Sequence, residues 1–263
     1  PTPPVALTIA GSDSGGGAGI QADLKTFAFH GIHGVSAITC VTAQNTLGVR
    51  RVDAIPAEGV AAQLQALNED FSIAAAKIGM LLNTEIMEAV ATELAKSPLP
   101  QLVLDPVMVA RSGDRLIDDE AVEIVRERLL PMATIVTPNV AEAEVLAGCK
   151  IEEIESAKEA ATKLVELGAK AVLITGGGLS GESRSTDVLL DDGTPVLLRT
   201  ECVATTNTHG TGCTLSAAIA ANLALGQELT DSVHKAKDYL TRALSAGLTL
   251  GNGAGPVCHN PPS

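Results

Sequence analysis

The segment Asn207–Ala218 combines residue types that suit anion binding. Capping residues and two glycines, Gly210 and Gly212, lead into a helix of small side chains. The first turn of such a helix exposes unpaired N–H groups, which together with the helix dipole suit a migrating phosphoryl group. Cys213 falls in that turn, where the same dipole favours the thiolate and predicts a base or nucleophile. An isolated cysteine is ordinarily a small buried hydrophobe, but the adjoining anion site favours the chemical role. His209 fits a cap or a pocket wall better than a proton carrier.

A second candidate is the run Gly11–Gly19, which places five glycines within nine residues between a predicted strand and a predicted helix. Glycine lets the backbone approach a ligand closely, although a merely tight turn is the alternative. The run matches neither the P-loop pattern nor the dinucleotide pattern, because Ile20 stands where the last glycine should be. In open α/β sheets ligands sit beyond the carboxyl ends of the strands, where this loop must lie.

Two acidic residues follow apolar strands. Asp105 ends one strand, and Glu142 follows Thr137-Pro138-Asn139 at the start of a helix. Both would lie at the carboxyl edge of a sheet, where hard oxygen ligands can hold Mg²⁺ with the help of nucleotide phosphates. A cap or turn role for Asp105, and a dipole-stabilising role in the first helical turn for Glu142, are equally good interpretations.

Gln44 and Met80 also follow strands. A primary amide both donates and accepts, so Gln44 can match the adjacent N and NH₂ of an amino-heterocycle, although a solvated loop glutamine is the alternative. Met80 can pack on a flat ring or simply fill the core.

The run Gly176–Gly181 satisfies the spacing G-x-G-x-x-G. A β-like segment follows it instead of a helix, so a pyrophosphate would have no helix N-terminus to rest on. We therefore reject it as a dinucleotide site.

The elements that must position these residues alternate between short apolar runs and segments of helical period, which is typical of βαβ units. The predicted strands are Val5–Ile9, Val35–Val41, Val49–Ile55, Ala75–Ile78, Leu102–Leu104, Thr134–Val136 and Ala171–Thr175. The predicted helices are Ile20–His30, Pro56–Asp70, Thr84–Lys96, Asp119–Leu130, Val140–Ala147, Ile154–Leu167, Gly210–Leu225 and Thr230–Leu250. Asp187–Leu190 and Pro195–Arg199 flank Asp191-Asp192-Gly193, which predicts a hairpin at the sheet's edge. We expect a single α/β domain over residues 1–263, with a mainly parallel sheet covered by helices.

Composition excludes several classes of protein. The 263 residues are 46% hydrophobic and 19% charged, which is a globular composition with a sizeable core. Only 2% are aromatic and the formal net charge is −13, so neither a base-stacking nucleic-acid surface nor an anionic membrane is an expected partner. The five cysteines are odd in number and contain no C-x-x-C pair, which excludes a disulfide framework and a zinc site and predicts a reducing, cytoplasmic setting. We expect no export signal and no membrane span.

Five motifs in this order resemble the hydroxymethylpyrimidine/phosphomethylpyrimidine kinases of thiamine biosynthesis, which are members of the ribokinase-like superfamily. The motifs are residues 10–23, Lys77-Ile78-Gly79-Met80, Asp105-Pro106-Val107-Met108, Thr137-Pro138-Asn139 and residues 209–216. The resemblance covers nearly the whole chain, and the first and last motifs together are highly specific.

The resemblance implies a three-layer α/β/α sandwich and ATP-dependent phosphorylation of 4-amino-5-hydroxymethyl-2-methylpyrimidine, then of its monophosphate, by a magnesium-dependent homodimer. It implies an anion hole and catalytic site formed by Gly210, Thr211, Gly212 and Cys213. The pyrimidine would lie against Gly11, Ala18, Asp23, Gln44, Met80 and Val107. The nucleotide would bind near Asn139, Thr175, Gly177, His209 and Lys237. Magnesium would be held by Asp105 and Glu142.

These roles make chemical sense, because phosphoryl transfer asks mainly for positioning and charge neutralisation. One anion hole can serve both steps, with Cys213, as a thiolate of near-neutral pKa, accepting the hydroxymethyl proton in the first. In the second step the acceptor is already an anionic phosphate, so a base matters less.

The chain departs from the family at Thr175-Gly176-Gly177-Gly178, where many relatives have Lys-Gly-Gly-His, and at Gly251-Asn252-Gly253, where some have lysine. Lys237 is the candidate replacement for a missing cation, and a solvated helix lysine is the alternative. Three other functions stay open: a pyridoxal-type kinase of the same superfamily, a catalytically silent metabolite-binding protein and, remotely, a dinucleotide oxidoreductase.

Overall fold

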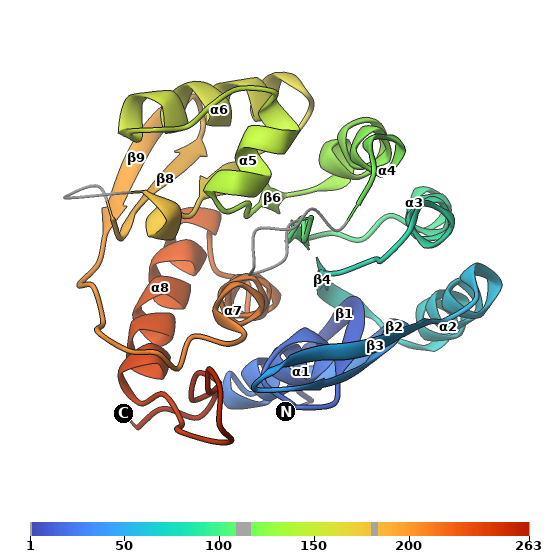
Figure 1. Cartoon of the computed structure of the whole chain (residues 1–263). Coiled ribbons are helices and arrows are strands. Elements are labelled where there is room, and N and C mark those ends of the chain that lie inside the picture. Colours follow the sequence, from blue (N-terminus) through green and yellow to red (C-terminus); the bar gives the residue numbers. More distant parts are fainter. Residues whose placement is uncertain (1, 109–116, 180–183, 263) are drawn as a thin grey trace.

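A computed structural model describes residues 2–108, 117–179 and 184–262. One nine-stranded sheet runs through it in the order β3-β2-β1-β4-β5-β6-β7-β8-β9. Figure 1 shows the labelled strands of this sheet with helices on both sides. The strands are β1 (Val5–Asp13), β2 (His33–Asn45), β3 (Gly48–Ala54), β4 (Ile73–Ile78), β5 (Leu102–Leu104), β6 (Ile135–Val136), β7 (Val172–Ile174), β8 (Thr186–Asp191) and β9 (Thr194–Arg199). Six neighbouring strands run parallel, namely β2, β1, β4, β5, β6 and β7. The strands β3, β8 and β9 are antiparallel to their neighbours.

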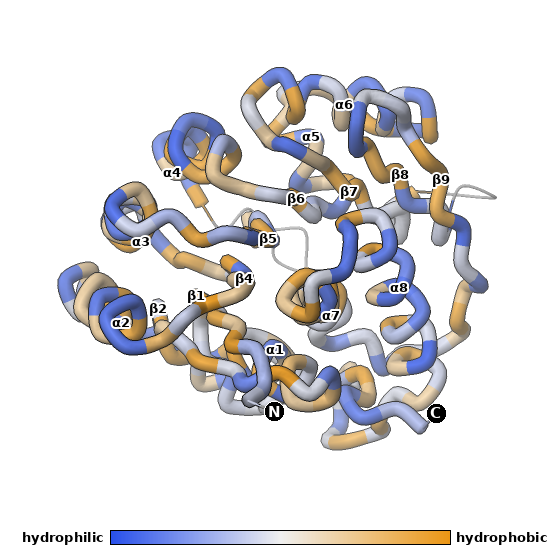
Figure 2. The backbone as a smooth tube through the Cα atoms, turned by 180° about the vertical axis from the view of Figure 1, so that it is seen from behind, coloured by the Kyte–Doolittle hydropathy of each residue, from blue (hydrophilic) through white to orange (hydrophobic). Residues whose placement is uncertain are grey.

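Helices cover both faces of the sheet. The helices are α1 (Gly19–Phe29), α2 (Ala57–Asp70), α3 (Thr84–Lys96), α4 (Asp119–Ile124), α5 (Val140–Ala147), α6 (Ile154–Glu166), α7 (Thr211–Ala224) and α8 (Leu229–Ser245). Helices α2 to α6 pack against one face, and α1, α7 and α8 pack against the other, each over its own apolar core. In Figure 2 the outer helices α2, α3 and α6 carry both hydrophilic and hydrophobic positions, as expected for helices with one buried face. The predicted three-layer α/β/α architecture with a hairpin in the C-terminal half is confirmed.

The hairpin of β2 and β3 was not expected, because Val49–Ile55 was interpreted as part of a βαβ unit. The strands pair antiparallel, with Asn45 opposite Gly48. A parallel crossover needs a dozen or more residues, and the two-residue connection Thr46-Leu47 is far too short for one. The Asn45 side chain accepts a hydrogen bond from the Leu47 amide at 2.9 Å and so stabilises the turn.

Two helices end earlier than predicted. The helix expected over Asp119–Leu130 is α4 followed by a π-helical turn at Val125–Leu129 and a 3₁₀ turn at Leu130–Met132, where Pro131 has no amide to continue an α-helix. The helix expected to reach Leu250 ends at Ser245, and the Leu248 amide donates to Pro256 instead of continuing the helical ladder.

The glycine run Gly176–Gly181 lies only partly within the residues that the structure describes, because Ser180 and Gly181 belong to the undescribed residues 180–183. The part described, Gly176–Gly178, is a 3₁₀ turn after β7.

No helix in the described ranges is both long and apolar enough to cross a bilayer.

Candidate active site

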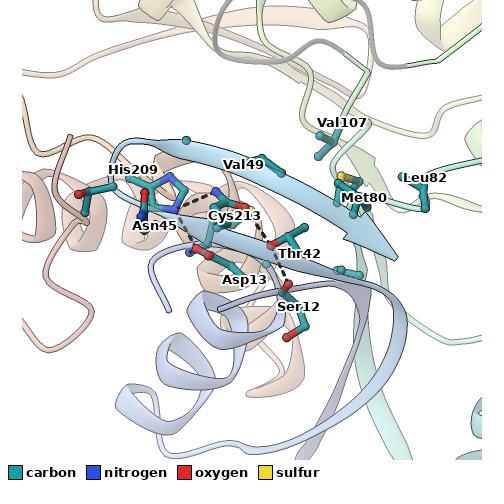
Figure 3. A pocket seen from close by; sticks show the side chains of 18 of the residues that line it. Ser12, Asp13, Thr42, Asn45, Val49, Met80, Leu82, Val107, His209 and Cys213 are labelled. Carbon is teal, nitrogen blue, oxygen red and sulfur yellow. Dashed lines mark hydrogen bonds and ion pairs between the residues drawn. The ribbon is translucent and has the colours of Figure 1, made fainter. Parts of the chain in front are cut away.

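A cavity of about 780 Å³ opens at the carboxyl ends of β1, β2 and β4. Its lining joins the glycine-rich loop after β1, the β2–β3 hairpin and the first turn of α7. Figure 3 shows Met80, Leu82 and Val107 on one side and Asp13 and His209 on the other. Segments far apart in sequence meet here because parallel strands bring all their carboxyl ends to one edge.

Seven of the predicted site residues line this cavity: Gly11, Ala18, Gln44, Met80, Val107, His209 and Cys213. The backbone of Gly11 forms part of the wall. A Cβ atom there would lie 2.7 Å from the Cys40 sulfur and 2.9 Å from the Met80 methyl group. A side chain at this position would therefore displace one of these sulfur-containing groups.

Cys213 lies in the first turn of α7 and faces the cavity. Gly210 caps this helix in the left-handed conformation, with φ of 83°. The amides of Gly212 and Cys213 have no acceptor within the helix, because each would need a carbonyl that lies before its first turn. The first turn of α7 therefore provides the amides that the predicted anion site would use.

The near-neutral pKa expected for Cys213 is wrong. Burial raises the pKa of this thiol to about 11, helped by the negative charges of Asp23 and Asp105, against a lowering effect of Lys77 and of a hydrogen bond from the Gly19 backbone. Loss of water around the sulfur outweighs the favourable end of the helix dipole.

Asp23 does not line the cavity, although a substrate contact was predicted. It is fully buried beneath it, where its carboxylate lies 2.9 and 3.0 Å from the Lys77 ammonium and accepts a hydrogen bond from Thr8 at 2.6 Å. Burial lowers the pKa of Lys77, but the Asp23 and Asp105 carboxylates raise it more, so the lysine stays charged. Lys77, unlike Asp23, reaches the cavity wall.

The two predicted magnesium ligands lie at the ends of β5 and β6 and outside the cavity lining. Asp105 accepts a hydrogen bond from Ser216 at 2.9 Å and lies 3.9 Å from Lys77. Glu142 forms a capping box with Asn139, accepting from its amide at 3.0 Å. Burial, reinforced by the charge of Asp105, raises the pKa of Glu142 to about 8.

The remaining nucleotide candidates gather further along the sheet. The Thr175 amide donates to the Pro138 carbonyl at 3.0 Å, which places Thr175 beside Asn139. Gly177 is exposed in the turn that follows. Lys237 is not a solvated lysine: it is buried and its ammonium lies 2.5 Å from Asp187, whose other oxygen accepts the Gly176 amide at 2.9 Å. Its charge is therefore neutralised within the protein.

Two charged residues of the site were missed by sequence reasoning. Asp13 accepts hydrogen bonds from the Gly15, Gly17 and Ala18 amides. The sequence pattern that could have identified Asp13 is an aspartate shortly before glycines, which is typical of loops whose backbone amides bond to a side-chain oxygen. The signal for Lys77 was its place in an otherwise apolar strand, since a fully buried lysine is almost always paired.

Comparison with known proteins gives the same family as the motifs. The phosphomethylpyrimidine kinase family matches residues 13–258. The hydroxymethylpyrimidine/phosphomethylpyrimidine kinase of Synechococcus elongatus is 55% identical over 97% of this chain and 97% of that protein. The thiamine biosynthesis bifunctional protein ThiED of Geobacter sulfurreducens is 47% identical over 96% of this chain, which spans 51% of that protein.

A solved structure supports the fold independently. The ADP complex of Bacillus subtilis pyridoxal kinase has a TM-score of 0.93 and 39% identity, covering 99% of this chain and 98% of that chain. The predicted ribokinase-like architecture is confirmed by this likeness. With the family match over residues 13–258, it establishes that the chain belongs to the phosphomethylpyrimidine kinase family.

Proposed function

We propose that this chain transfers the γ-phosphoryl group of ATP to the hydroxymethyl group of 4-amino-5-hydroxymethyl-2-methylpyrimidine, and then to the resulting monophosphate, in thiamine biosynthesis. The observation that carries the proposal is the cavity in which Gln44 and the glycine-rich loop face Cys213 at the start of α7. The residues proposed to bind the ring and the turn proposed to bind the phosphoryl group therefore line the same cavity.

The pyrimidine ring would lie between the Met80 and Val107 side and the glycine-rich loop. Gln44 offers the donor and acceptor that adjacent ring nitrogen and amino groups require. Its amide oxygen lies 3.0 Å from the Thr42 hydroxyl, which holds the side chain at the cavity wall. Glycine at position 11 lets the Cys40 sulfur and the Met80 methyl group pack against the backbone of the cavity wall, where a Cβ would collide with them.

The phosphoryl group would be held by backbone amides of the turn Gly210, Thr211, Gly212 and Cys213. A local site of this kind is needed, since the protein has a formal net charge of −13 and would repel ATP at long range. The helix dipole of α7 adds partial positive charge where negative charge develops. The nucleotide would extend toward Asn139, Thr175 and Gly177 at the ends of β6 and β7.

Cys213 would accept the hydroxymethyl proton in the first step. A thiol with a pKa of about 11 is largely protonated at neutral pH, so the ionised base is scarce but strong. Phosphoryl transfer tolerates this, because bonding to the nucleophile is weak in its loose transition state. The second step has an anionic acceptor and needs no such base.

Magnesium fits the carboxylates present. Asp105 and Glu142 are both buried, and the charge of Asp105 contributes to the raised pKa of Glu142, so a bound cation would favour the ionised form of Glu142. The described residues contain no group of three or more His, Cys, Asp or Glu side chains that could hold a metal. Mg²⁺ typically takes one or two protein carboxylates and completes its shell with water and phosphate oxygens. When bound, it would neutralise charge on the transferred phosphates.

The predicted single domain, homodimer and cytoplasmic location stay predictions. The β2–β3 hairpin exposes Val41, Val49 and Val52, and β3 is exposed along its whole length. Such an apolar edge is consistent with a partner. Light scattering on the purified protein would measure the oligomeric state.

The function is tested by incubating the protein with ATP, Mg²⁺ and the hydroxymethylpyrimidine, and following its mono- and diphosphate by chromatography. We expect the monophosphate first and the diphosphate after it. Ligand binding without ATP consumption would contradict the proposal and identify a silent metabolite-binding protein. Omitting Mg²⁺ in the presence of a chelator should abolish both products.

Pyridoxal kinase is the alternative acceptor specificity, and it is not favoured. The curated relative at 55% identity carries the pyrimidine kinase name, whereas the pyridoxal kinase structure is 39% identical. Pyridoxal in place of the pyrimidine in the same assay separates the two. Phosphorylation of pyridoxal without any pyrimidine diphosphate would favour the alternative.

A further inference from the structure

The carboxylate of Asp13 joins two segments that are far apart in sequence. One oxygen accepts the Gly15 amide at 2.8 Å, and the other accepts the amides of Gly17 at 3.1 Å and Ala18 at 2.9 Å. That second oxygen also lies 2.8 Å from His209 Nε2. Burial raises the pKa of Asp13, but the hydrogen bonds from His209, Gly15 and Ala18 hold it below its ordinary value. The ionised carboxylate only accepts, so His209 must donate from Nε2.

The two segments are also in close backbone contact. A Cβ atom on Gly210 would lie 1.8 Å from the Gly17 carbonyl oxygen, and one on Gly17 would lie 2.5 Å from the His209 ring. The glycine-rich loop therefore packs directly against the turn that opens α7. Any shift of one segment must move the other or open a gap between them.

The C-terminal segment holds the main chain of His209 in place. The His209 amide donates to Gly255 at 3.1 Å, and its carbonyl accepts the Val257 amide at 3.2 Å. Figure 1 shows this C-terminal segment beside the first helix of the chain. With the backbone fixed on one side and the imidazole bonded on the other, His209 is a rigid link rather than a mobile side chain.

The imidazole also lies beside Gln44, the residue proposed to hydrogen-bond the substrate ring. Its Nε2 lies 3.5 Å from the Gln44 amide nitrogen, and both residues line the cavity. Since Nε2 carries its hydrogen toward Asp13, it cannot accept from the Gln44 NH₂ group. That amide keeps its donors for a ligand.

We propose that His209 is a positioning residue for phosphoryl transfer, which with Asp13 holds the substrate-binding glycine loop in register with the anion-binding turn of α7. This inference rests on the proposed kinase function. It differs from the nucleotide contact predicted for His209, because the imidazole is bonded to the glycine-rich loop.

The first test compares His209→Leu, which removes the donor, with His209→Gln, whose amide can still donate to Asp13. We expect kcat for the pyrimidine alcohol to fall about 100-fold in the leucine variant, because small misplacement of reacting groups is enough for a loss of this size. We expect KM to change by less than about threefold, because binding of each substrate alone is little affected. The glutamine variant should recover kcat to within about tenfold of the original chain. His234→Leu, the same substitution at an exposed position on α8, is the matched control.

The second test is independent of activity and uses hydrogen–deuterium exchange of the ligand-free protein. His209→Leu should speed exchange in peptides that contain residues 13–19 and 208–214, while His209→Gln and His234→Leu should not. Unchanged exchange in both segments, or a kcat in the leucine variant within about threefold of the original, would overturn the inference. Absence of any phosphorylated product from the original chain would defeat the proposed function instead, and exchange would still decide whether His209 couples the two segments.

Discussion

At the scale of single residues, Cys213 shows two opposing effects of its position. The helix terminus favours a thiolate, but the cavity floor removes the water that a thiolate needs, and burial raises the pKa to about 11. The sulfur nevertheless faces the cavity next to the amides of the α7 turn, where an acceptor hydroxyl would lie. Its geometry suits a base, while its ionisation makes that base pH-dependent.

Replacing Cys213 with alanine should therefore impair the alcohol step far more than the phosphate step. We expect a loss of about 100-fold or more in kcat with the pyrimidine alcohol, because a positioned general base commonly contributes that much, and a loss of less than about tenfold with the monophosphate. The two steps are measured in separate assays started from each acceptor.

The same assays also test the ionisation of the Cys213 thiol, and a second cysteine variant serves as the control. In the original chain the alcohol rate should rise with pH from 7 to 9, because the thiolate fraction grows toward the pKa of about 11. Cys202→Ala, at an exposed cysteine, should leave both steps unchanged. Equal losses in the two steps of Cys213→Ala would remove this residue from the role of base.

Lys77 and Asp23 form a fully buried ion pair that links β4 to α1 beneath the cavity. Lys77→Met should destabilise the protein by about 3–5 kcal/mol, because it leaves the Asp23 carboxylate buried without its cation. Adding Asp23→Leu to this variant should recover most of the loss, since both charges are then gone. Urea denaturation of the original chain, the two single variants and the double variant measures the coupling free energy between Lys77 and Asp23. A Lys77→Met variant as stable as the original chain would contradict the pairing.

At the scale of elements, the turn before α7 depends on backbone that no other residue type can supply. Gly210 has φ of 83°, and its Cα faces the Gly17 carbonyl so closely that a Cβ would lie 1.8 Å from the oxygen. The amides proposed to bind the phosphoryl group can therefore approach the glycine-rich loop only with glycine at this position.

Gly210→Ala should consequently abolish most of the activity, by about 100-fold in kcat, because the turn must move away from the loop. Gly226→Ala is the matched control: it follows the same helix with φ of 76° but has nothing within 4 Å of the added Cβ. We expect that variant to lose about 1–2 kcal/mol of stability from its left-handed backbone and to keep its kcat. Similar kcat values for the two variants would show that close packing at Gly210 is unimportant.

At the scale of the whole molecule, the sheet and the C-terminal segment enclose the site together. The chain after α8 returns to Pro256 and His259, where the Tyr239 hydroxyl donates to the His259 carbonyl at 2.8 Å. The His259 side chain is buried, and its Nε2 has no hydrogen-bond partner among the described residues. Burial, with smaller contributions from the neighbouring Lys25 and His209, lowers its pKa to about 4.

This histidine should make the fold sensitive to acid. The unfolded chain binds a proton at His259 near pH 6.5, whereas the folded protein does so only near pH 4. The stabilising effect is thus complete above pH 6.5 and is lost as pH falls toward 4, by up to about 3 kcal/mol. Urea unfolding at pH 7 and pH 4.5 should show a smaller difference for His259→Leu than for the original chain. His234→Leu is the control, and an equal difference in all three proteins would exclude His259 as a cause.

The sequence by itself determined the order of strands and helices and the hairpin of β8 and β9, and it predicted the glycine loop and the α7 turn as ligand-binding segments. Periodicity, turn residues and caps are local properties, so they can be interpreted without neighbours. The elements predicted wrongly were also local: the short connection Thr46-Leu47 already excluded a parallel crossover to β3, and Pro131 already limited the helix before it.

Only the tertiary structure decided the electrostatics of the site. The pairing of Asp23 with Lys77, the hydrogen bond between Asp13 and His209, and the ion pair that neutralises Lys237 all join segments that are distant in sequence. The pKa of Cys213 shows the same dependence, since its helix position is local but its burial depends on the segments packed around the first turn of α7. Desolvation and charge pairing depend on distances in three dimensions, and residue spacing alone does not contain those distances.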